Sequence, residues 1–446
     1  PAGNLTAAGV DAFLEGSYPG PEPKVYGDPL IMLARAGKVD PTSLKDFEEH
    51  GGYAGLRKAL TLIPEALIAT AKDSGIAGRG GAMFPLGTKW EMTRAAPGNP
   101  SGKHIVANAD ESEPGTFKDR VAMEQDPFSL IEAMTLAAYA VGVENGWIFL
   151  RGEYPLCHAR LKNAIEQARE AGYLGRNILG RVGFNFDIEL RRGAGAYICG
   201  EETALFEAIE GKRGFPRIKP PFPTTHGLFQ QPTAINNVES LLAVLAVINA
   251  GLDRWRELGT EGSPGTKWFC LSGRVVRPGL YEVPFGLTIR ELIELAGGVA
   301  GKEVQGVLLG GAAGIFIGPE RLDARLTYED AREKGFPLGS GVVMVFDDLD
   351  DVQTSLHLLA RFFAHESCGK CYPCSLGTQR QLEIIERVVH GGETRPADVT
   401  NLRNIGLAMT QTSLCGLGQT AASAVLSAVE RWPEMMAPYQ GNGHEP

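Results

Sequence analysis

The chain has 446 residues, a length that accommodates two to four domains. Its formal net charge of −10 argues against nucleic acid as a ligand, because binding to phosphate backbones needs a basic surface. The longest apolar run, residues 241–252, is shorter than the ~18 residues of a membrane span. No basic and apolar leader is visible, and three of the seven cysteines lie close together, so we expect a cytoplasmic protein in a reducing compartment.

The first 45 residues are poor in periodic patterns. Proline and glycine at residues 18–29 predict an extended arm that lies on another surface. Helical patterns follow at residues 43–49, 53–60 and 64–72, the last with Pro64 at a first-turn position.

A glycine-rich stretch, SGIAGRGGAMFPLGTKW, covers residues 74–90. Its glycines permit positive φ and a close approach of the backbone to a phosphate or a flat ring. Arg79 and Lys89 add positive charge for an anionic ligand. The stretch matches neither the dinucleotide fingerprint nor a Walker A loop, and a glycine-rich turn without a ligand is the alternative.

Polar side chains follow a short apolar strand predicted over residues 104–108. Asn108, Asp110, Glu111 and Glu113 come at its carboxyl end, where open α/β sheets bind their ligands. A solvated acidic turn is the alternative. The pattern continues with a helix at residues 126–142, a strand at 146–150, a helix at 160–172 and a strand at 186–190.

The second glycine-rich stretch, residues 192–211, ends a strand and starts a helix near Glu201 and Glu202. Backbone N–H groups at such a helix start can hold a phosphate or a ring carbonyl. Two adjacent carboxylates suit ribose hydroxyls or a redox ring better than phosphate alone. Downstream, the rigid segment 216–225 carries Lys219 and presents Phe222 as a stacking surface.

Asn236 and Asn237 precede a helical pattern over residues 238–249, as N-cap residues or as ligand amides. Residues 251–265 are linker-like, and the unit that follows, residues 268–345, is rich in strands around one helix at 287–296. A sheet that wraps one helix is a ubiquitin-like or β-grasp arrangement.

Three cysteines separated by two residues each, Cys368, Cys371 and Cys374, lie in a loop between predicted helices, and Cys415 follows 40 residues later. This spacing is typical of a [4Fe–4S] cluster. Zinc competes less well because zinc sites usually pair two short cysteine hooks, and unligated thiols are the third interpretation. The helices at residues 350–364, 379–389, 399–409 and 420–431 predict a bundle that carries the cluster at one end.

Together these segments resemble the NADH-binding flavoprotein (51 kDa) subunit of respiratory complex I and the diaphorase subunits of NAD-dependent formate dehydrogenases and hydrogenases. The resemblance covers roughly residues 45–435 and depends on the strings GRGGAMFPLGTKW, NADESEPGTFKDR, RRGAGAYICGEETAL, KPPFP, INNVES, ESCGKCYPC and SLCGLG. It implies an α/β multidomain protein. The expected parts are an N-terminal arm (1–45), a Rossmann-like FMN- and NADH-binding domain (46–258), a β-grasp SLBB domain (266–346) and a C-terminal four-helix bundle with the [4Fe–4S] cluster (350–446).

The resemblance also implies roles for single residues. NAD(H) would exchange hydride with FMN, and FMN would exchange single electrons with the cluster. Glu113 and Glu202 are the catalytic candidates. The cluster ligands would be Cys368, Cys371, Cys374 and Cys415. FMN would contact Gly78, Arg79, Gly80, Lys89, Asn108, Asp110, Glu111, Tyr197, Gly200, Glu201, Asn236 and Asn237, and NADH would add Phe84, Glu113, Glu202, Lys219 and Phe222.

Met83 departs from the family pattern, which has glycine there. We expect a modest effect on nucleotide binding, because Glu113, Glu202 and Phe222 are all present. The sequences of residues 413–436 and 211–223 are more similar to those of the formate dehydrogenase and hydrogenase diaphorases, and this favours a soluble complex of that type. The alternatives are the respiratory complex I subunit, an electron-relay subunit that has lost NAD binding, and a zinc-stabilised interaction protein.

The seven cysteines leave no set for a further iron–sulfur domain. The resemblance therefore implies two partners, a small thioredoxin-like [2Fe–2S] subunit and a larger iron–sulfur catalytic subunit. It implies no direct membrane insertion, and any attachment to the inner membrane would run through partner subunits.

Overall fold

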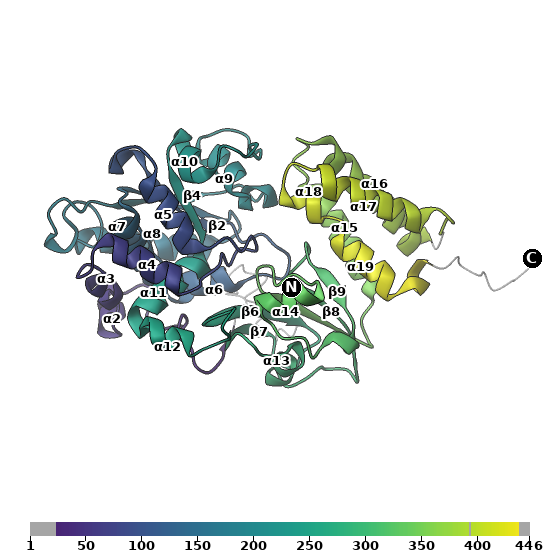
Figure 1. Ribbon diagram of the computed structural model, residues 1–446. Coiled ribbons are helices and arrows are strands. Elements are labelled where there is room, and N and C mark those ends of the chain that lie inside the picture. The colour runs from purple at the N-terminus through teal and green to yellow at the C-terminus, as the bar shows by residue number, and fades with distance from the viewer. Residues whose placement is uncertain (1–23, 392–393, 437–446) are drawn as a thin grey trace, which may run out of the picture.

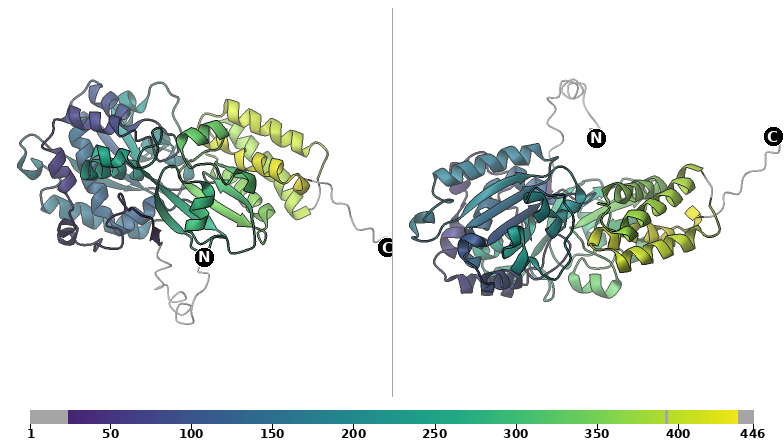
Figure 2. Two further views of the ribbon diagram at one scale, coloured as in Figure 1. Left: turned by 60° about the horizontal axis from the view of Figure 1, so that its bottom comes forward. Right: turned by 90° about the horizontal axis from the view of Figure 1, so that it is seen from above.

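The computed structural model describes residues 24–391 and 394–436. They form three regions (Figure 1): the first region (residues 34–258) at the left, the middle region (residues 259–347 and strand β1) below the centre, and the helical region (residues 352–436) at the right. Two further views show the same arrangement (Figure 2). Residues 1–23 of the predicted arm lie outside the described residues. No helix in the described ranges combines the length and apolar content that crossing a membrane requires.

A four-stranded parallel sheet with the order β4–β3–β2–β5 is the centre of the first region. Its strands are β2 (His104–Ala109), β3 (Asn145–Leu150), β4 (Asp187–Arg192) and β5 (Thr233–Asn237). Strand β5 was not predicted, because its five residues show no alternation and end in two asparagines. Since the strands run in one direction, their carboxyl ends share one edge, and the register places Asn108 opposite Asn237.

Strand β2, in the middle of the sheet, is buried on both faces, and its successive residues point to opposite sides. Ile105 and Ala107 belong to the large core that includes helices α7 and α11. Val106 faces a smaller core with Leu205 and Phe206. The helices of the region are α2 (Leu44–Glu49), α3 (Ala54–Ala59), α4 (Pro64–Asp73), α5 (Leu86–Ala95), α6 (Lys118–Gln125), α7 (Pro127–Val141), α8 (Pro155–Glu170), α9 (Glu202–Ile209), α10 (Pro223–His226), α11 (Val238–Ala250) and α12 (Leu252–Arg256).

Glu132 is a buried carboxylate of α7 that binds the start of α3. Its two oxygens accept hydrogen bonds from the backbone N–H groups of Tyr53, at 3.0 Å, and Leu56, at 2.9 Å. Burial raises the pKa of Glu132 to about 7, although these N–H groups oppose the shift. The carboxyl group therefore binds its proton more tightly in the folded protein than in the unfolded chain.

We expect Glu132→Gln to reduce the pH dependence of stability. A pKa raised on folding contributes stability that is complete below the ordinary value and is lost as the pH rises through the folded value. The melting temperature of the wild-type protein should fall between pH 5 and pH 8. That of the variant should fall less, and the difference should correspond to about 2 kcal/mol in the free energy of unfolding. Thermal unfolding at several pH values measures this difference. An identical pH profile for both proteins would contradict the assignment.

The middle region is built on a six-stranded mixed sheet with the order β1–β7–β6–β10–β8–β9. Its core lies on the side of helix α13, whose N-terminus has a capping box between Thr288 and Glu291. The structure adds a second helix to the one that was predicted. The elements are β1 (Val25–Tyr26), β6 (Thr266–Gly273), β7 (Gly279–Pro284), α13 (Ile289–Leu295), β8 (Val304–Leu309), β9 (Ile315–Ile317), α14 (Tyr328–Lys334) and β10 (Val342–Asp347).

The N-terminal segment is fixed on this sheet. Strand β1 pairs in parallel with β7, with Val25 opposite Leu280. The buried carboxylate of Glu282 accepts hydrogen bonds from the backbone N–H groups of Ile31, Met32 and Leu33 at 3.0, 2.9 and 2.9 Å. The described part of the predicted arm thus includes an edge strand and a tightly bound turn.

The helical region packs α15 against α16 and α19, and α17 against α16 and α19. Its helices are α15 (Val352–Glu366), α16 (Tyr372–Gly391), α17 (Asp398–Thr412), α18 (Gly416–Thr420) and α19 (Ser423–Arg431). Helix α16 begins well before the predicted residue 379, so the cysteine loop is shorter than expected. Helix α19 contacts β9 and joins this region to the middle region.

Candidate functional site

The carboxyl edge of the parallel sheet brings together the two glycine-rich stretches and the ends of β2 and β5. The Asn108 side-chain amide donates to the Gly200 carbonyl at 2.8 Å. The loop after Ala77 closes on itself, because the Gly78 N–H donates to the Phe84 carbonyl at 2.9 Å. A Cβ on Gly80 would lie 3.3 Å from the Asn237 Cβ, so the loop lies against the end of β5.

Asp110 lies at this edge with one of its two carboxylate oxygens unpartnered. Its Oδ2 is buried and accepts no hydrogen bond from any described residue. Burial raises the pKa of Asp110 to about 7. An unpaired buried polar atom costs about 1–3 kcal/mol, and a ligand with hydroxyl donors, such as the ribityl chain of FMN, would remove that cost. The residues present therefore fit a flavin at this edge.

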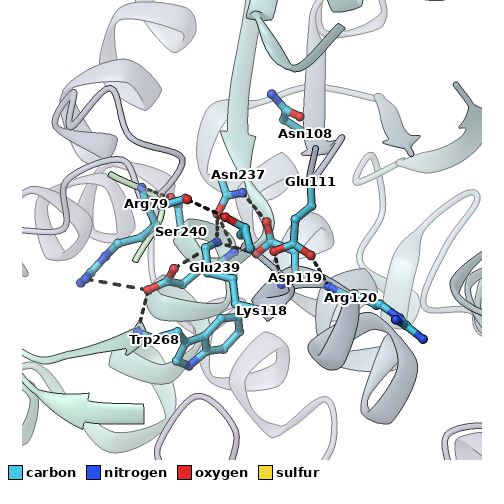
Figure 3. Close-up of polar contacts among 12 residues, drawn as sticks. Arg79, Asn108, Glu111, Lys118, Asp119, Arg120, Asn237, Glu239, Ser240 and Trp268 are labelled. Carbon is cyan, nitrogen blue, oxygen red and sulfur yellow. Dashed lines mark hydrogen bonds and ion pairs between the residues drawn. The ribbon is translucent and has the colours of Figure 1, made fainter. Parts of the chain in front are cut away.

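Arg79 and Glu111 point into the protein (Figure 3). The Arg79 guanidinium is 1% exposed and lies 3.9 Å from the Glu239 carboxylate. The Glu111 carboxylate accepts hydrogen bonds from the Asp119 and Arg120 N–H groups, both at 2.9 Å, and thereby caps α6. The Arg79 side chain is therefore directed away from a ligand at the sheet edge, and only the backbone of Arg79 could contact that ligand.

Helix α9 starts with its own carboxylate cap. Glu201 Oε2 accepts hydrogen bonds from the N–H groups of Thr203 and Ala204, both at 2.9 Å, so these groups are already occupied. The Lys219 ammonium lies 3.0 Å from Glu201 Oε1 and 2.9 Å from Glu202 Oε1. Lysine and the two carboxylates thus form one polar group, which suits sugar hydroxyls better than a phosphate.

Two aromatic rings are presented to solvent beside this group. Phe84, which precedes α5, is 44% exposed, and Phe222, which precedes α10, is 55% exposed. Helices α5 and α10 contact each other. Exposed aromatic faces are suited to stacking on a nucleotide base.

The remaining predicted residues of this edge are bound to the protein itself. The Lys89 ammonium donates to the Ile235 carbonyl at 2.8 Å. The Asn236 side chain accepts a hydrogen bond from the Trp90 indole at 3.0 Å. Asn237 is the N-cap of α11, since its side chain accepts from the Glu239 N–H at 3.0 Å.

Glu113 lies where the three regions meet. One of its carboxylate oxygens accepts the Ala313 N–H of the middle region at 2.8 Å, and the other accepts the Tyr197 hydroxyl. The Tyr197 ring packs edge-on against Phe362 of α15, with ring centroids 5.0 Å apart. Burial raises the pKa of Glu113. The first region therefore holds this partly buried carboxyl group between a backbone N–H of the middle region and the Tyr197 hydroxyl.

The four cysteines of the predicted cluster gather at one end of the helical region. Cys374 is buried, and Cys368, Cys371 and Cys415 pack in the same apolar group. Burial and the charges of these three neighbours raise the pKa of Cys374 to about 11, although Ser367 opposes the shift. No three His, Cys, Asp or Glu side chains in the described ranges surround a point that one metal ion would occupy. A cubane, in contrast, binds each of its four thiolates through a different iron atom, and the donor set fits it.

The end of α15 and the cysteine loop contact the second glycine-rich stretch and the segment that follows it. The Tyr197 N–H donates to Glu366 at 3.0 Å, and the Lys370 ammonium donates to the Pro216 carbonyl at 2.6 Å. One apolar group includes Ile198 and Cys374. The sheet edge and the four thiols are therefore neighbours, as electron transfer between two cofactors requires.

Sequence reasoning missed four buried charged residues behind the sheet edge: Lys118, Asp119, Glu239 and Lys267. Each is at most 2% exposed. No local pattern marks them, because a buried charge depends on partners that are far away in the sequence. Lys118, Asp119 and Glu239 lie within the motifs NADESEPGTFKDR and INNVES, which did not by themselves indicate a role for them.

The fold and the site define a redox protein that combines a ligand-binding parallel sheet with a four-thiolate iron–sulfur site. Three family models match the chain in order: the Nuo51 FMN-binding domain over residues 71–246, the SLBB domain over 269–311, and the NADH-ubiquinone oxidoreductase-F iron-sulfur binding region over 355–438.

Curated relatives match over nearly the whole length. The NADH-quinone oxidoreductase-F subunit of Aquifex aeolicus is 41% identical over 95% of this chain and 98% of its own. The HndC subunit of the NADP-reducing hydrogenase of Solidesulfovibrio fructosivorans is 43% identical over 90% of this chain and 81% of its own. A crystal structure of an NAD+-reducing [NiFe]-hydrogenase in the H2-reduced state matches with a TM-score of 0.83, 34% identity, and coverage of 98% of this chain and 74% of that chain.

The chain belongs to the NADH-quinone oxidoreductase-F family. This confirms the resemblance that the sequence motifs indicated. It is an oxidoreductase subunit of the NADH dehydrogenase type, with FMN and a [4Fe–4S] cluster as cofactors and NAD(H) as substrate. The zinc interpretation of the cysteines is thereby set aside.

Proposed function

We propose that the chain is the diaphorase subunit of a soluble NAD-dependent formate dehydrogenase or hydrogenase-type complex. The observation that carries the proposal is the contact of Tyr197, at the sheet edge, with Glu366, at the end of α15 directly before the cysteine loop. This contact places the proposed flavin site, which would exchange two electrons with NAD(H), next to the cluster site, which would accept electrons one at a time. When bound, FMN supplies hydride exchange with NAD(H) and one-electron exchange with the cluster.

The residues of the chain bind and orient these groups. Asp110 and Asn108 would hold the ribityl chain, and the loop through Gly78 and Gly80 would approach the flavin closely. Gly200, Lys89, Tyr197, Asn236 and Asn237 would complete that site, and Arg79, Glu111 and Glu201 would support it from behind. Cys368, Cys371, Cys374 and Cys415 would bind the [4Fe–4S] cluster.

The nucleotide would bind on the solvent side of the flavin. Phe84 and Phe222 would stack on its rings, and Glu202 with Lys219 would bind its sugar hydroxyls. Glu113, which accepts the Tyr197 hydroxyl, would fix the nicotinamide end. Glu113 and Glu202 are the catalytic candidates in this scheme, because both would touch the reacting nucleotide.

The domain boundaries belong to the same proposal. They are an arm over residues 1–45, a Rossmann-like FMN and NADH domain over 46–258, a β-grasp SLBB domain over 266–346 and a four-helix bundle over 350–446. The parallel sheet, the mixed sheet with α13, and the packing of α15, α16, α17 and α19 support these assignments.

Relatives are named as subunits of larger enzymes, so partner subunits exist. We propose that a small thioredoxin-like [2Fe–2S] subunit and a larger iron–sulfur catalytic subunit assemble with this chain in the cytoplasm. The respiratory quinone reductase is the second candidate, since the curated quinone oxidoreductase relatives match as well as the hydrogenase relative does.

An anaerobic NADH titration of the chain loaded with FMN and iron tests the activity. Bleaching of the flavin and cluster absorbance at micromolar NADH is the expected result. Bleaching by dithionite with no response to NADH or NADPH would overturn the diaphorase assignment, and the chain would then be an electron relay.

Met83→Gly is expected to change the dissociation constant of NADH by less than about threefold, which corresponds to under 1 kcal/mol. Met83 has φ +53°, the left-handed conformation that glycine adopts most easily, and its side chain is 46% exposed. The loop thus keeps the backbone path expected of glycine, and the side chain points outward. Equilibrium titration of both proteins checks this, and a gain of tenfold or more in the variant would contradict it.

A further inference from the structure

Six charged side chains lie between the first and the middle regions, and we call them the interface cluster. Each is at most 5% exposed. Five of them are labelled in Figure 3. The members are Arg79, Glu111, Lys118, Asp119, Glu239 and Lys267.

Glu239 is the centre of the interface cluster. Its carboxylate lies 3.1 Å from the Lys118 ammonium, 3.8 Å from the Lys267 ammonium and 3.9 Å from the Arg79 guanidinium. It also accepts the backbone N–H of Trp268 at 3.1 Å. Burial alone would raise the pKa of Glu239, but the cations of Lys267, Lys118 and Arg79 hold it below the ordinary value. One carboxylate therefore serves cations from a loop, from α6 and from β6.

The positive charges of the interface cluster are only partly balanced. Three cations face the carboxylates of Glu239 and Asp119, while burial raises the pKa of Glu111 to about 7. Nε and Nη1 of Arg79, and the Lys267 ammonium, donate no hydrogen bond to any described residue. Removing the charge of Glu239 would leave these cations without their shared anion.

The interface cluster continues directly into the proposed flavin site. The Asn237 side chain accepts a hydrogen bond from Lys118 at 3.0 Å and donates one to Asp119 at 2.6 Å. The Arg79 N–H donates to the Ser240 hydroxyl at 2.9 Å, which fixes the glycine-rich loop to α11. On the opposite side, Lys267 and Trp268 belong to strand β6 of the middle region.

We propose that Glu239 is a positioning residue through which the middle region sets the shape and the charge of the flavin site. The inference rests on the proposed function, in that FMN binds at the sheet edge beside Asn237 and the glycine-rich loop. Two-electron reduction of a flavin with uptake of one proton adds one negative charge. Buried cations next to the site favour that reduced form, and the Glu239 carboxylate moderates their effect.

Three variants and one control test this inference: Glu239→Gln, Lys267→Met, the double variant, and Glu132→Gln. The readouts are the dissociation constant of FMN for the apoprotein and the flavin midpoint potential, with dithionite as the reductant. Glu239→Gln should weaken FMN binding about tenfold or more and shift the potential to more positive values. Lys267→Met should shift the potential to more negative values. The control removes an equally buried carboxylate whose hydrogen-bond partners, Tyr53 and Leu56, are outside the cluster, and it should change neither readout.

The double variant separates positioning from charge. It keeps the net charge of the interface cluster, so its potential should return close to the wild-type value, while FMN binding stays weak because the link to β6 is lost. If Glu239→Gln does not fold, the other two variants carry the test. Unchanged FMN binding and potential in all variants, or shifts in one common direction, would overturn the inference. A wild-type flavin that dithionite reduces and NADH does not would refute the proposed function and leave this result standing.

Discussion

Cys415→Ala is expected to abolish the iron–sulfur cluster. The four thiols come from two segments that meet only in the folded helical region, and Cys415 stands alone at the start of α18. Without it, one iron of the cubane has no protein ligand. The iron content should fall from about 4 atoms per chain to below about 1, and the broad iron–sulfur absorbance should disappear. Iron and sulfide analysis with the visible spectrum measures the loss.

The flavin should survive this change, because its proposed residues lie in the first region. NADH should still bleach the flavin of the variant, while electron delivery to acceptors that use the cluster is lost. Cys157→Ser is the matched control, since Cys157 is a buried thiol of α8 that donates weakly to the Arg120 carbonyl. A full complement of iron in Cys415→Ala would contradict the ligand assignment.

Asp110→Asn is expected to stabilise the apoprotein and to weaken FMN binding. The buried Oδ2 has no partner in the described protein, so its charge destabilises the apoprotein, and a bound ligand that donates to it would offset this loss. At pH 8 the free energy of unfolding of the apoprotein should rise by about 1–3 kcal/mol. The dissociation constant of FMN should increase about 10- to 100-fold, as for the loss of a hydrogen bond to a charged group.

The stability difference between Asp110→Asn and the wild type should depend on pH in a definite direction. Burial raises the pKa of Asp110 to about 7, above its ordinary value, so the folded wild-type protein loses stability as the pH rises toward 7. The advantage of the variant should therefore shrink when the pH is lowered through 7. Glu132→Gln is the control, because it removes another buried carboxylate and should leave FMN binding unchanged. A variant that binds FMN as tightly as wild type would exclude Asp110 from the flavin site.

Local patterns identified three of the four strands of the parallel sheet, β2, β3 and β4. The apolar run at residues 104–108 became β2, and the polar residues after it do follow a shared carboxyl edge. Strand β5 was missed because five residues with no alternation of apolar and polar side chains cannot be distinguished from a loop. Its partner β2 lies more than 120 residues earlier in the chain, and pairing decides its conformation.

The direction of side chains was harder to predict than their position. Arg79 and Lys89 were both expected to face an anionic ligand, yet Arg79 pairs with Glu239 and Lys89 donates to a backbone carbonyl. Glu201 caps the helix whose N–H groups were expected to bind a ligand. These outcomes depend on charges and carbonyls that folding brings near, and sequence spacing does not encode them.

The pairing of β1 with β7 also concerns how the chain is made. A ribosome releases Val25–Tyr26 among the first described residues, but the strand that receives them, Gly279–Pro284, emerges some 250 residues later, and the Glu282 carboxylate that binds the turn of Ile31 emerges with it. Contacts with such a long sequence separation form late. The β1 segment therefore cannot pair until β7 has been synthesised, and the pairing of β1 completes this edge of the middle region.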